Sequence, residues 1–486
     1  MIEHPKTRLA LALSVSVFLS GCAVGPDFTR PDVPLPEQYE TTGTTATSEA
    51  APLNPEWWTL FGDAELNRLV ALALENNQDL QAAIARMEAA AAAAREAGAD
   101  YVPSIDLEGS SLRNHSSART ASGKQTGAMT ISDHRAALGV SYELDLWGRI
   151  RRLNEAARAE ALAGRYARDT VRLSLTSQIA AEYLTLRVVD AELETTAETL
   201  SSRQKSLNIV RSRQDAGVSS ALDMAQARGA LAAAQAQWNQ LRRQRAMSEN
   251  MLGLLTGQPD LKLDAVGNFN AIPLPPLPPA GLPSSLLEVR PDVRLAEEQL
   301  IAANARIGVA KAAYFPTIGL TGLLGNESAD IADLFNKGTH IWSAGGALFL
   351  PIFNAGRTGA RVDQATAGQK EALANYLKIV QNAFREVKDA LVALREYKEE
   401  DVALAIQTDA AREAQDISQA RYEAGYVGFL DVLDSQRTLN NAQLVQQLGR
   451  RNHLVAAVDL FKALGGGWRP DWQASNEASA ETRSGE

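Results

Sequence analysis

Residues 422–436 read YEAGYVGFLDVLDSQ and interrupt a long helical pattern of apolar and alanine residues. Gly425 stands where that pattern stops, and glycine ends helices because it adopts a left-handed backbone without strain. Asp431 and Asp434 follow, and an aspartate in the first turn of a new helix stabilises its unpaired N–H groups. A similar stretch, QDAGVSSALDMAQ, begins 208 positions earlier and covers residues 214–226. The chain is therefore expected to contain the same helix–turn–helix element twice.

Further motifs occupy equivalent positions in the two halves of the chain. They are YVPSIDL at 101–107 with YFPTIGL at 314–320, and DLWGR at 145–149 with FNAGR at 353–357. Motifs that recur in the same order in both halves indicate an internal duplication. We expect two repeats, residues 65–256 and 286–464, each in the order helix, strand pair, long helix, turn, helix. The proline-rich residues 257–285 would connect them in an extended form.

Proline placement predicts long helices, because proline breaks them. None occurs between Pro103 and Pro259, or between Pro351 and Pro470. At ~1.5 Å per residue, a helix of roughly 65 residues reaches on the order of 100 Å, as in a coiled coil or a rod-like bundle. The segments with helical spacing of apolar and alanine residues lie near 65–100, 150–214, 222–256, 293–312, 361–422 and 431–464.

Four shorter segments alternate between apolar and polar residues, as strands with one apolar and one wet face do. The clearest is Leu138–Leu146, whose even positions are apolar and whose odd positions are glycine or polar. The predicted strands cover about 103–113, 134–147, 316–326 and 340–354, the last with the weakest alternation. This pattern fits a half-buried soluble sheet as well as a membrane barrel.

A barrel would require more than one copy of the chain, because an open sheet edge is not tolerated in lipid. Two, three or four chains would supply eight, twelve or sixteen strands. Side chains fill the interior of an eight-stranded barrel. A conduit would therefore need at least three chains. We expect the polar segments 114–133 and 327–339 to form external loops.

The N-terminus carries the features of an export signal. Lys6 and Arg8 precede an apolar run over residues 9–19, which is too short to span a membrane as a mature helix. The run leads into Cys22, the only cysteine of the chain. We predict a signal peptide over residues 1–21. An extended N-terminal segment over 22–64 and a polar C-terminal tail over 465–486 complete the expected domain organisation.

The stretch LSGC resembles a bacterial lipobox, in which the cysteine becomes the lipid-bearing first residue of the mature chain. By this resemblance Cys22 carries a covalent lipid such as palmitate, and we expect no other cofactor. Ala23 stands where an aspartate typically retains lipoproteins in the inner membrane, which favours the outer membrane. Two or more acyl chains would anchor the protein stably. An ordinary signal peptide with a chance cysteine is the alternative.

Composition and motif content argue against a nucleic-acid-binding protein and against an enzyme. The formal net charge is −10, whereas nucleic-acid-binding domains concentrate positive charge. An enzyme needs a convergent set of reactive groups, but the chain has no HExxH, paired CxxC, P-loop or GxSxG motif. The SRQK stretch at 202–205 matches SxxK only as a chance match within a charged helix. We expect no catalytic centre and no metal site.

Taken together, four stretches resemble the TolC/OprM-type outer membrane factors, and among them the lipoprotein branch that serves RND-type tripartite efflux pumps. The resemblance covers essentially the whole mature chain. The stretches are CAVGPDFTRPDVPLP at 22–36, WWTLFGDAELNRLVALALENNQDLQAA at 57–83, EVRPDVRLAEEQLIAANARIGVAKAAYFPTIGLTG at 288–322, and AGYVGFLDVLDSQRTL at 424–439.

This resemblance implies a mainly α fold with a transmembrane β-barrel. A homotrimer would close a twelve-stranded barrel in the outer membrane of a Gram-negative bacterium, four strands coming from each chain. Below it, a long α-helical barrel would extend into the periplasm. The protein would be a passive exit duct without catalytic activity. Its implied partners are a periplasmic adaptor protein and an inner membrane RND transporter, besides the lipid of the outer membrane.

The resemblance also assigns roles to the two turns. Asp431 and Asp434 match aspartates that ring the periplasmic constriction, Asp223 is the equivalent of Asp431 in the first half, and Tyr422 matches a tyrosine that helps to hold the tip closed. Helix capping alone would also account for both aspartates of the second turn. The residues implied to dock the adaptor are Gly217, Val218, Gly425 and Tyr426.

One departure from the family concerns the latch of the closed tip. Val427 stands where some members have an arginine. Arg211, Arg213 and Arg421 are the candidate replacements for that arginine.

Two other functions fit the sequence less well. A type I secretion duct would pass proteins through the same architecture, and a structural envelope lipoprotein would have no pore. The lipobox and the RPDVRLAEEQL stretch at 290–300 favour small-molecule efflux over protein secretion. The wet-facing residues of the predicted strands argue against a protein without a pore. Substrate and partner pump are not specified by the sequence.

Overall fold

The computed structural model describes residues 23–34, 55–121, 123–264, 269–276 and 290–467. The predicted signal peptide, Cys22, and most of the predicted C-terminal tail lie outside these residues. The described chain divides into two compact units, and all but one of the boundaries between them fall within helices. Unit 1 comprises residues 1–32, 87–164 and 296–376, and unit 2 comprises 33–86, 165–295 and 377–486.

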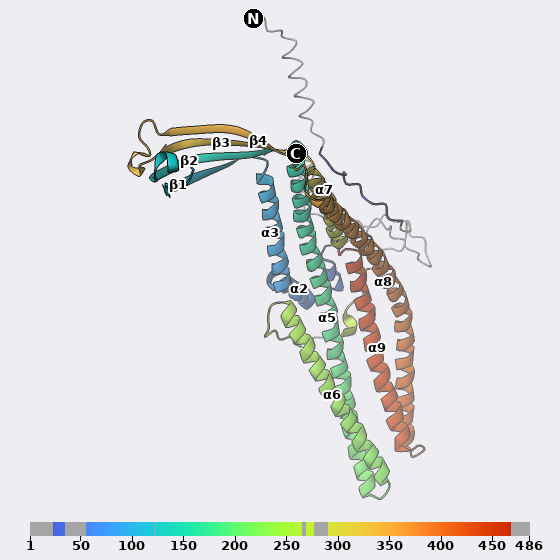
Figure 1. Cartoon of the computed structure of the whole chain (residues 1–486). Coiled ribbons are helices and arrows are strands. Elements are labelled where there is room, and N and C mark those ends of the chain that lie inside the picture. The colour runs from blue at the N-terminus through green and yellow to red at the C-terminus, as the bar shows by residue number, and fades with distance from the viewer. Residues whose placement is uncertain (1–22, 35–54, 122, 265–268, 277–289, 468–486) are drawn as a thin grey trace, which may run out of the picture. The chain divides into compact units, whose positions relative to one another are not determined.

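Unit 1 contains a single antiparallel four-stranded sheet in the order β1-β2-β3-β4 (Figure 1). The strands are β1 Ser104–Ser116, β2 Met129–Leu144, β3 Thr317–Ser328 and β4 His340–Phe349. The short elements α4 Gly123–Thr126 and η4 Ile331–Asp333 lie in the β1–β2 and β3–β4 connections.

Two strand boundaries differ from the sequence prediction by five residues. β2 begins five residues before the expected start at residue 134, because Met129–Asp133 continue the pairing with β1 as far as Ser116. β4 ends at Phe349 rather than near 354, because its partner β3 begins at Thr317 and offers no residue beyond it. The polar connection between β1 and β2 is therefore shorter than expected.

The register of the sheet places apolar and polar residues on opposite faces. Leu107 lies opposite Leu138, which lies opposite Leu324, which lies opposite Trp342. These side chains are exposed in the single chain, Leu107 and Trp342 each by 77%. On alternate positions, Arg135 and Glu327 form an ion pair. The sheet thus has an uncovered apolar face and a wet face, which a water-soluble chain rarely leaves so exposed.

Close approach of β2 and β3 makes Gly325 a sensitive position. A Cβ there would lie 2.3 Å from the Ala136 carbonyl oxygen and 2.5 Å from the Ala137 Cα. We predict that Gly325→Ala lowers the free energy of unfolding by about 1–3 kcal/mol, because the two strands must separate. Gly319→Ala on the same strand is the control, since its Cβ meets nothing within 4 Å. Equal thermal stability of the two purified variants would contradict the prediction.

The N-terminal residues 23–32 of unit 1 are held in place by polar contacts and close packing. Val24 donates its N–H to the Trp147 carbonyl oxygen at 2.9 Å, and Arg30 pairs with Glu297 through two hydrogen bonds. A Cβ on Gly148 would lie 2.7 Å from that of Ala23. Residue 23 therefore lies beside the Trp147–Gly148 corner, which connects the end of β2 to the next helix.

Unit 2 begins with a 3₁₀ helix that the predicted extended segment did not include. In η1 Trp57–Phe61, the Trp57 side chain is buried and stacks on Phe461, with ring centroids 5.5 Å apart. The prediction of an extended segment up to residue 64 is therefore wrong over these residues. The contact that fixes η1 lies some 400 positions away in sequence, beyond the reach of a local pattern.

The helix predicted over residues 65–100 is broken at Asn77. It forms α2 Ala64–Asn76 and α3 Gln78–Ala99. Asp63 caps α2 by accepting the N–H groups of Glu65 and Leu66. The Asn77 side chain accepts the Leu80 N–H and donates to the Leu255 carbonyl oxygen. The asparagine amide accepts and donates at once, and this buried double contact accounts for the break.

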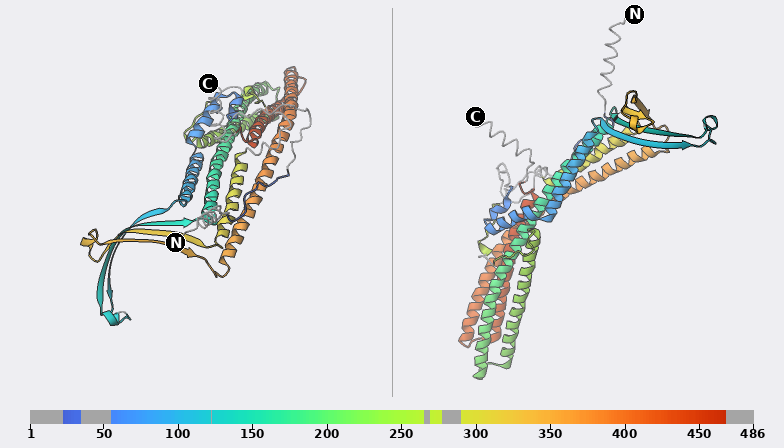
Figure 2. Two further views of the ribbon diagram at one scale, coloured as in Figure 1. Left: turned by 90° about the horizontal axis from the view of Figure 1, so that it is seen from above. Right: turned by 90° about the vertical axis from the view of Figure 1, so that its left-hand side faces the viewer.

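The remaining helices follow the same order in both halves of the chain. They are α5 Arg149–Asp215, α6 Ala221–Leu255, α7 Pro291–Ala312, α8 Arg357–Glu423 and α9 Phe429–Ala463, with the short η2 Phe269–Ala271 in the connector. α5 and α8 are each 67 residues long, and α6 and α9 are each 35. Within unit 2, α6 runs back along α5, and α9 along α8 (Figures 1 and 2).

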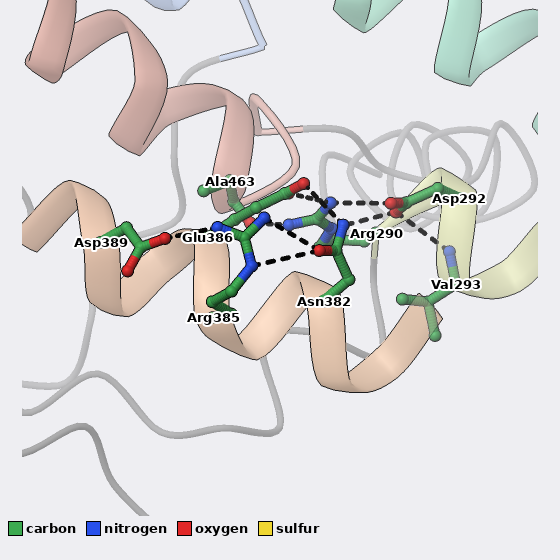
Figure 3. Close-up of polar contacts among 8 residues, drawn as sticks. All are labelled: Arg290, Asp292, Val293, Asn382, Arg385, Glu386, Asp389 and Ala463. Carbon is green, nitrogen blue, oxygen red and sulfur yellow. Dashed lines mark hydrogen bonds and ion pairs between the residues drawn. The ribbon is translucent and has the colours of Figure 1, made fainter. Parts of the chain in front are cut away.

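A buried arginine ties three elements of unit 2 together. Arg290 pairs with Asp292 at the start of α7 and with Glu386 on α8, at 2.7 and 2.8 Å (Figure 3). It also donates to the Ala463 carbonyl oxygen at the end of α9. Burial alone would lower the pKa of Arg290, but its hydrogen bonds to Asp292 and Glu386 outweigh burial and the pKa is raised. The guanidinium is therefore charged and fully engaged.

Candidate functional site at the two helix-connecting turns

The two turns of unit 2 have the same backbone geometry. Gly217 follows α5 with φ +77° and Gly425 follows α8 with φ +81°. In the first turn Val218 donates its N–H to the Arg213 carbonyl oxygen, and in the second Tyr426 donates to Arg421. Gly217 also donates to the Gln214 carbonyl oxygen, and Gly425 to that of Tyr422. The two bonds of each turn close its helix in the Schellman arrangement.

The glycines are required by backbone conformation and not by crowding. A Cβ on Gly217 or Gly425 would meet nothing within 4 Å. The residues that follow them project into solvent, Val218 being 71% and Tyr426 79% exposed. The four residues predicted to dock the adaptor therefore form two open apolar tips.

Beneath the tips, the two turns share one hydrophobic cluster. It combines residues of the first helix pair with residues of the second, and Val427 packs against its edge. The cluster consists of Val210, Met224, Ala227, Tyr422, Phe429 and Val432. Packing between the two helix pairs at this end thus depends on these few side chains.

Tyr422 lies in this cluster beside Phe429, with ring centroids 5.7 Å apart. The Arg213 guanidinium stands over the Tyr422 ring, 4.6 Å from its centroid. Of the three arginines considered as substitutes for the absent tip arginine, Arg213 is the one that contacts Tyr422 through a cation–π interaction. This contact links α5 of the first helix pair to α8 of the second.

Asp223 and Asp431 both cap the helices that they begin. Asp223 accepts the Ser220 N–H while Ser220 accepts that of Asp223, at 2.9 and 3.1 Å. Asp431 accepts the Gly428 N–H at 3.1 Å. Helix capping therefore accounts for the position of these two aspartates without any further role.

Asp434 is not used for capping. Its carboxylate pairs with Arg437 one turn further along α9, at 2.6 Å, and both side chains are exposed. Exposed pairs of this kind contribute only about 0–1 kcal/mol. Of the three tip carboxylates, Asp434 is therefore the one whose contacts within the chain hold it least firmly.

Two buried ionisable groups on α5 were not identified from the sequence. Arg203 is buried, and its guanidinium donates to the Gln436 side chain at 2.5 Å. Burial lowers the pKa of Arg203. It lines a groove of about 430 Å³ together with Asp434 and Gln226, the residue that replaces Asp434 in the first half. Periodicity could have shown only that Thr199 and Arg203 share a face of the helix.

The second group is Glu192, whose burial raises its pKa to about 7. A carboxyl group whose folded pKa exceeds its unfolded value loses stability as pH rises between the two values, here from about 4.5 to 7. We predict that Glu192→Gln is about 1–2 kcal/mol more stable than the wild type at pH 8, after allowance for partial solvent screening, and equally stable at pH 4.5. The control is Glu194→Gln, an exposed neighbour. Unfolding free energies measured across this range would contradict the prediction if the difference did not grow with pH.

The described residues contain neither an apolar membrane-spanning helix nor a cluster of metal ligands. No helix among them has an apolar stretch long enough to cross a membrane. No group of three or more histidine, cysteine, aspartate or glutamate side chains in the described part of the chain is arranged to hold a metal ion.

An open sheet with an exposed apolar face, together with paired helices that end in glycine turns, is typical of channel proteins of the outer membrane. The family model described as outer membrane efflux protein matches residues 69–258 and 282–466. The chain belongs to this family, which consists of channels and not of enzymes. The resemblance found in the sequence is thereby confirmed.

Individual relatives match over nearly their whole length. The probable efflux pump outer membrane protein TtgC of Pseudomonas putida is 37% identical, over 99% of this chain and 100% of the relative. The outer membrane protein OprJ of Pseudomonas aeruginosa is 36% identical, over 94% and 95%. The CmeC outer membrane channel of Campylobacter jejuni superimposes with a TM-score of 0.88 at 28% identity, over 94% of this chain and 98% of that chain.

Proposed function

We propose that the chain forms the exit duct of a tripartite efflux pump, as a homotrimer that conducts small molecules passively across the outer membrane. The sheet of unit 1 is the observation that carries this proposal. Its two outer strands, β1 and β4, pair with no further strand among the described residues. Its apolar face is exposed, and its other face carries the Arg135–Glu327 ion pair.

These features fit a barrel segment better than a free sheet. Unpaired edges cannot persist in lipid, so β1 of one copy would pair with β4 of the next. Three copies would give twelve strands, with the apolar face toward lipid and the wet face toward the lumen. Solved relatives with outer membrane channel architecture, including the open-state MtrE channel of Neisseria gonorrhoeae at a TM-score of 0.81 and 30% identity, support this assembly.

At the periplasmic end, we assign closure of the duct to Asp431 and Asp434, with Asp223 and Tyr422 in supporting roles. A trimer would bring six carboxylates of the second turn together near the axis. Like charges repel at roughly 332/(εr) kcal/mol per pair, so the ring would hold bound cations, which obstruct the narrow passage. Asp434 suits this role because its present partner is an exposed arginine.

The remaining parts of the proposal concern the anchor and the partners. Cys22 would carry the lipid, and the fixed course of residues 23–34 would hold it at the Trp147–Gly148 corner. The tips at Gly217, Val218, Gly425 and Tyr426 would receive the periplasmic adaptor, with an RND transporter in the inner membrane. Relatives described as antibiotic and toluene efflux pump proteins of Pseudomonas putida favour small molecules over proteins as cargo.

The assembly is tested by native mass spectrometry of the protein extracted from membranes in mild detergent. The proposal predicts three mature chains, each heavier than its polypeptide by the lipid on Cys22. The Cys22→Ala variant should lose the lipid mass and keep the trimer. A folded monomer or dimer would contradict the twelve-stranded barrel. A trimer without added mass would contradict the lipid anchor alone.

A further inference from the structure

A second, larger cavity of unit 2 lies along the seam between α6 and α9, with α5 as its floor. Its volume is about 980 Å³, at the upper end of the range for small-molecule sites. The α5 residues that line it recur at helical spacing and so present one face. They are Glu182, Thr185, Val188, Val189 and Glu192.

The walls of this cavity are apolar and adaptable. Met247 and Met251 of α6 and Leu448 of α9 line it, and each is unusually exposed for its type, Met247 by 62%. Methionine has a flexible, polarisable side chain that fits irregular apolar ligands. An apolar body could therefore displace water from these walls without a fixed complementary shape.

The floor supplies one desolvated carboxylate. Glu192 is only 7% exposed, and its carboxylate has neither a hydrogen bond nor an ion pair with any residue that the structure describes. Several side-chain nitrogens and oxygens of the described chain are fully buried and lack a hydrogen bond, but the Glu192 oxygens are not among them. They therefore keep some accessible surface, which a ligand in the cavity can reach. A buried carboxylate in this condition is stabilised by a cation.

The charged groups around Glu192 are few. Glu182 lies on the same face of α5, and Arg451 approaches from α9. Arg451 lowers the pKa of Glu192 only as the lesser influence after burial, and its own hydrogen bond goes to Thr185 at 3.5 Å. The lining residues of α6 include no charged group; the polar ones are Gln237, Gln240, Gln244 and Ser248. The lining thus carries one net negative charge.

We infer that this cavity binds a lipophilic monocation, whose positive charge rests against the Glu192 carboxylate and whose apolar body lies against Met247, Met251 and Leu448. A lipophilic anion would be repelled, because Glu182 and Glu192 outnumber Arg451 in the lining. A neutral ligand is disfavoured because it would leave the charge of Glu192 without a counter-ion. This inference goes beyond the proposed duct, which requires no binding site in its wall. It is also separate from the tip carboxylates.

The test is a titration of the purified full-length protein with tetraphenylphosphonium, whose charge does not change with pH, followed calorimetrically at pH 8. The expected result is saturable binding that Glu192→Gln weakens at least tenfold, while the matched control Glu194→Gln leaves it unchanged. Neutral triphenylphosphine oxide should bind both proteins equally weakly. Tetraphenylborate, the anionic counterpart, should not bind more tightly than the cation.

A second readout uses the wild-type protein alone and so does not depend on the folding of a variant. Protonation of Glu192 removes the attraction, so tetraphenylphosphonium affinity should fall several-fold between pH 8 and pH 5.5. Absence of saturable binding, equal affinity of wild type and Glu192→Gln, or an affinity independent of pH would each overturn the inference. The proposed duct would stand in any of these cases, because conduction is measured separately.

Discussion

Replacement of Arg290 by methionine is expected to lower the free energy of unfolding by about 3–5 kcal/mol. The substitution removes one partner from a buried cluster and leaves the carboxylates of Asp292 and Glu386 without their cation (Figure 3). It also removes the donor to the Ala463 carbonyl oxygen, so the end of α9 loses its contact with α7. Methionine retains the unbranched aliphatic part of the side chain, which limits the contribution of an empty cavity.

The neighbouring Arg385 offers a matched control. It pairs with Asp389 on the same helix, α8, at 2.5 Å, but both side chains are about 60% exposed. Arg385→Met should therefore change stability by less than about 1 kcal/mol. Urea unfolding followed by tryptophan fluorescence would measure both variants, since Trp57 is buried against Phe461 of α9. Similar decreases in the free energy of unfolding from the two substitutions would show that burial does not determine how much Arg290 contributes to stability.

Removal of the tip carboxylates is expected to raise ion flux through the proposed duct at least several-fold. In the double variant Asp431→Asn/Asp434→Asn, charge is lost from both positions of each chain, so the cations that obstruct the constriction are no longer held. An asparagine at position 431 can still accept the Gly428 N–H, because its side-chain oxygen is retained. Any increase in flux with this variant therefore comes from charge and not from loss of the helix cap. Salt influx into liposomes containing the protein, followed by light scattering, provides the measurement.

The alanine variants separate capping from gating. Asp431→Ala should reduce the stability of the turn by about 0.5–2 kcal/mol, whereas Asp434→Ala should have little effect on stability. Asp223→Ala should lower stability by a similar amount, because Asp223 makes the same capping contact in the first half. If alanine but not asparagine raised the flux, the aspartates would be helix caps and the carboxylate gate would be excluded.

The features predicted well from the sequence are those that local chemistry determines. Alternation over residues 138–146 indicated a strand with an apolar face, and the register opposite Leu324 and Leu107 shows the same face on neighbouring strands. Gly217 and Gly425 could be placed at helix ends because few other residues adopt a left-handed backbone. Capping by Asp431 likewise follows from its position three residues after the turn.

The features missed depend on contacts between distant parts of the chain. The break at Asn77 exists because its side chain reaches Leu255, 178 positions away. Arg203 and Glu192 looked like ordinary members of a charged helix, since only the approach of α6 and α9 buries them. None of the four stretches that carry the family resemblance lies in α5. The residues of the two turns were therefore predicted, whereas the buried residues along α5 were not.

The central claim, that three chains enclose a water-filled duct closed by carboxylates, is tested most directly by single-channel recording of the purified trimer in a planar bilayer. Wild type and Asp431→Asn/Asp434→Asn would be compared under the same salt. The account predicts discrete steps of uniform size for the wild type, and clearly larger steps for the variant. Absence of steps from both proteins, with the trimer folded and inserted, would contradict the duct itself.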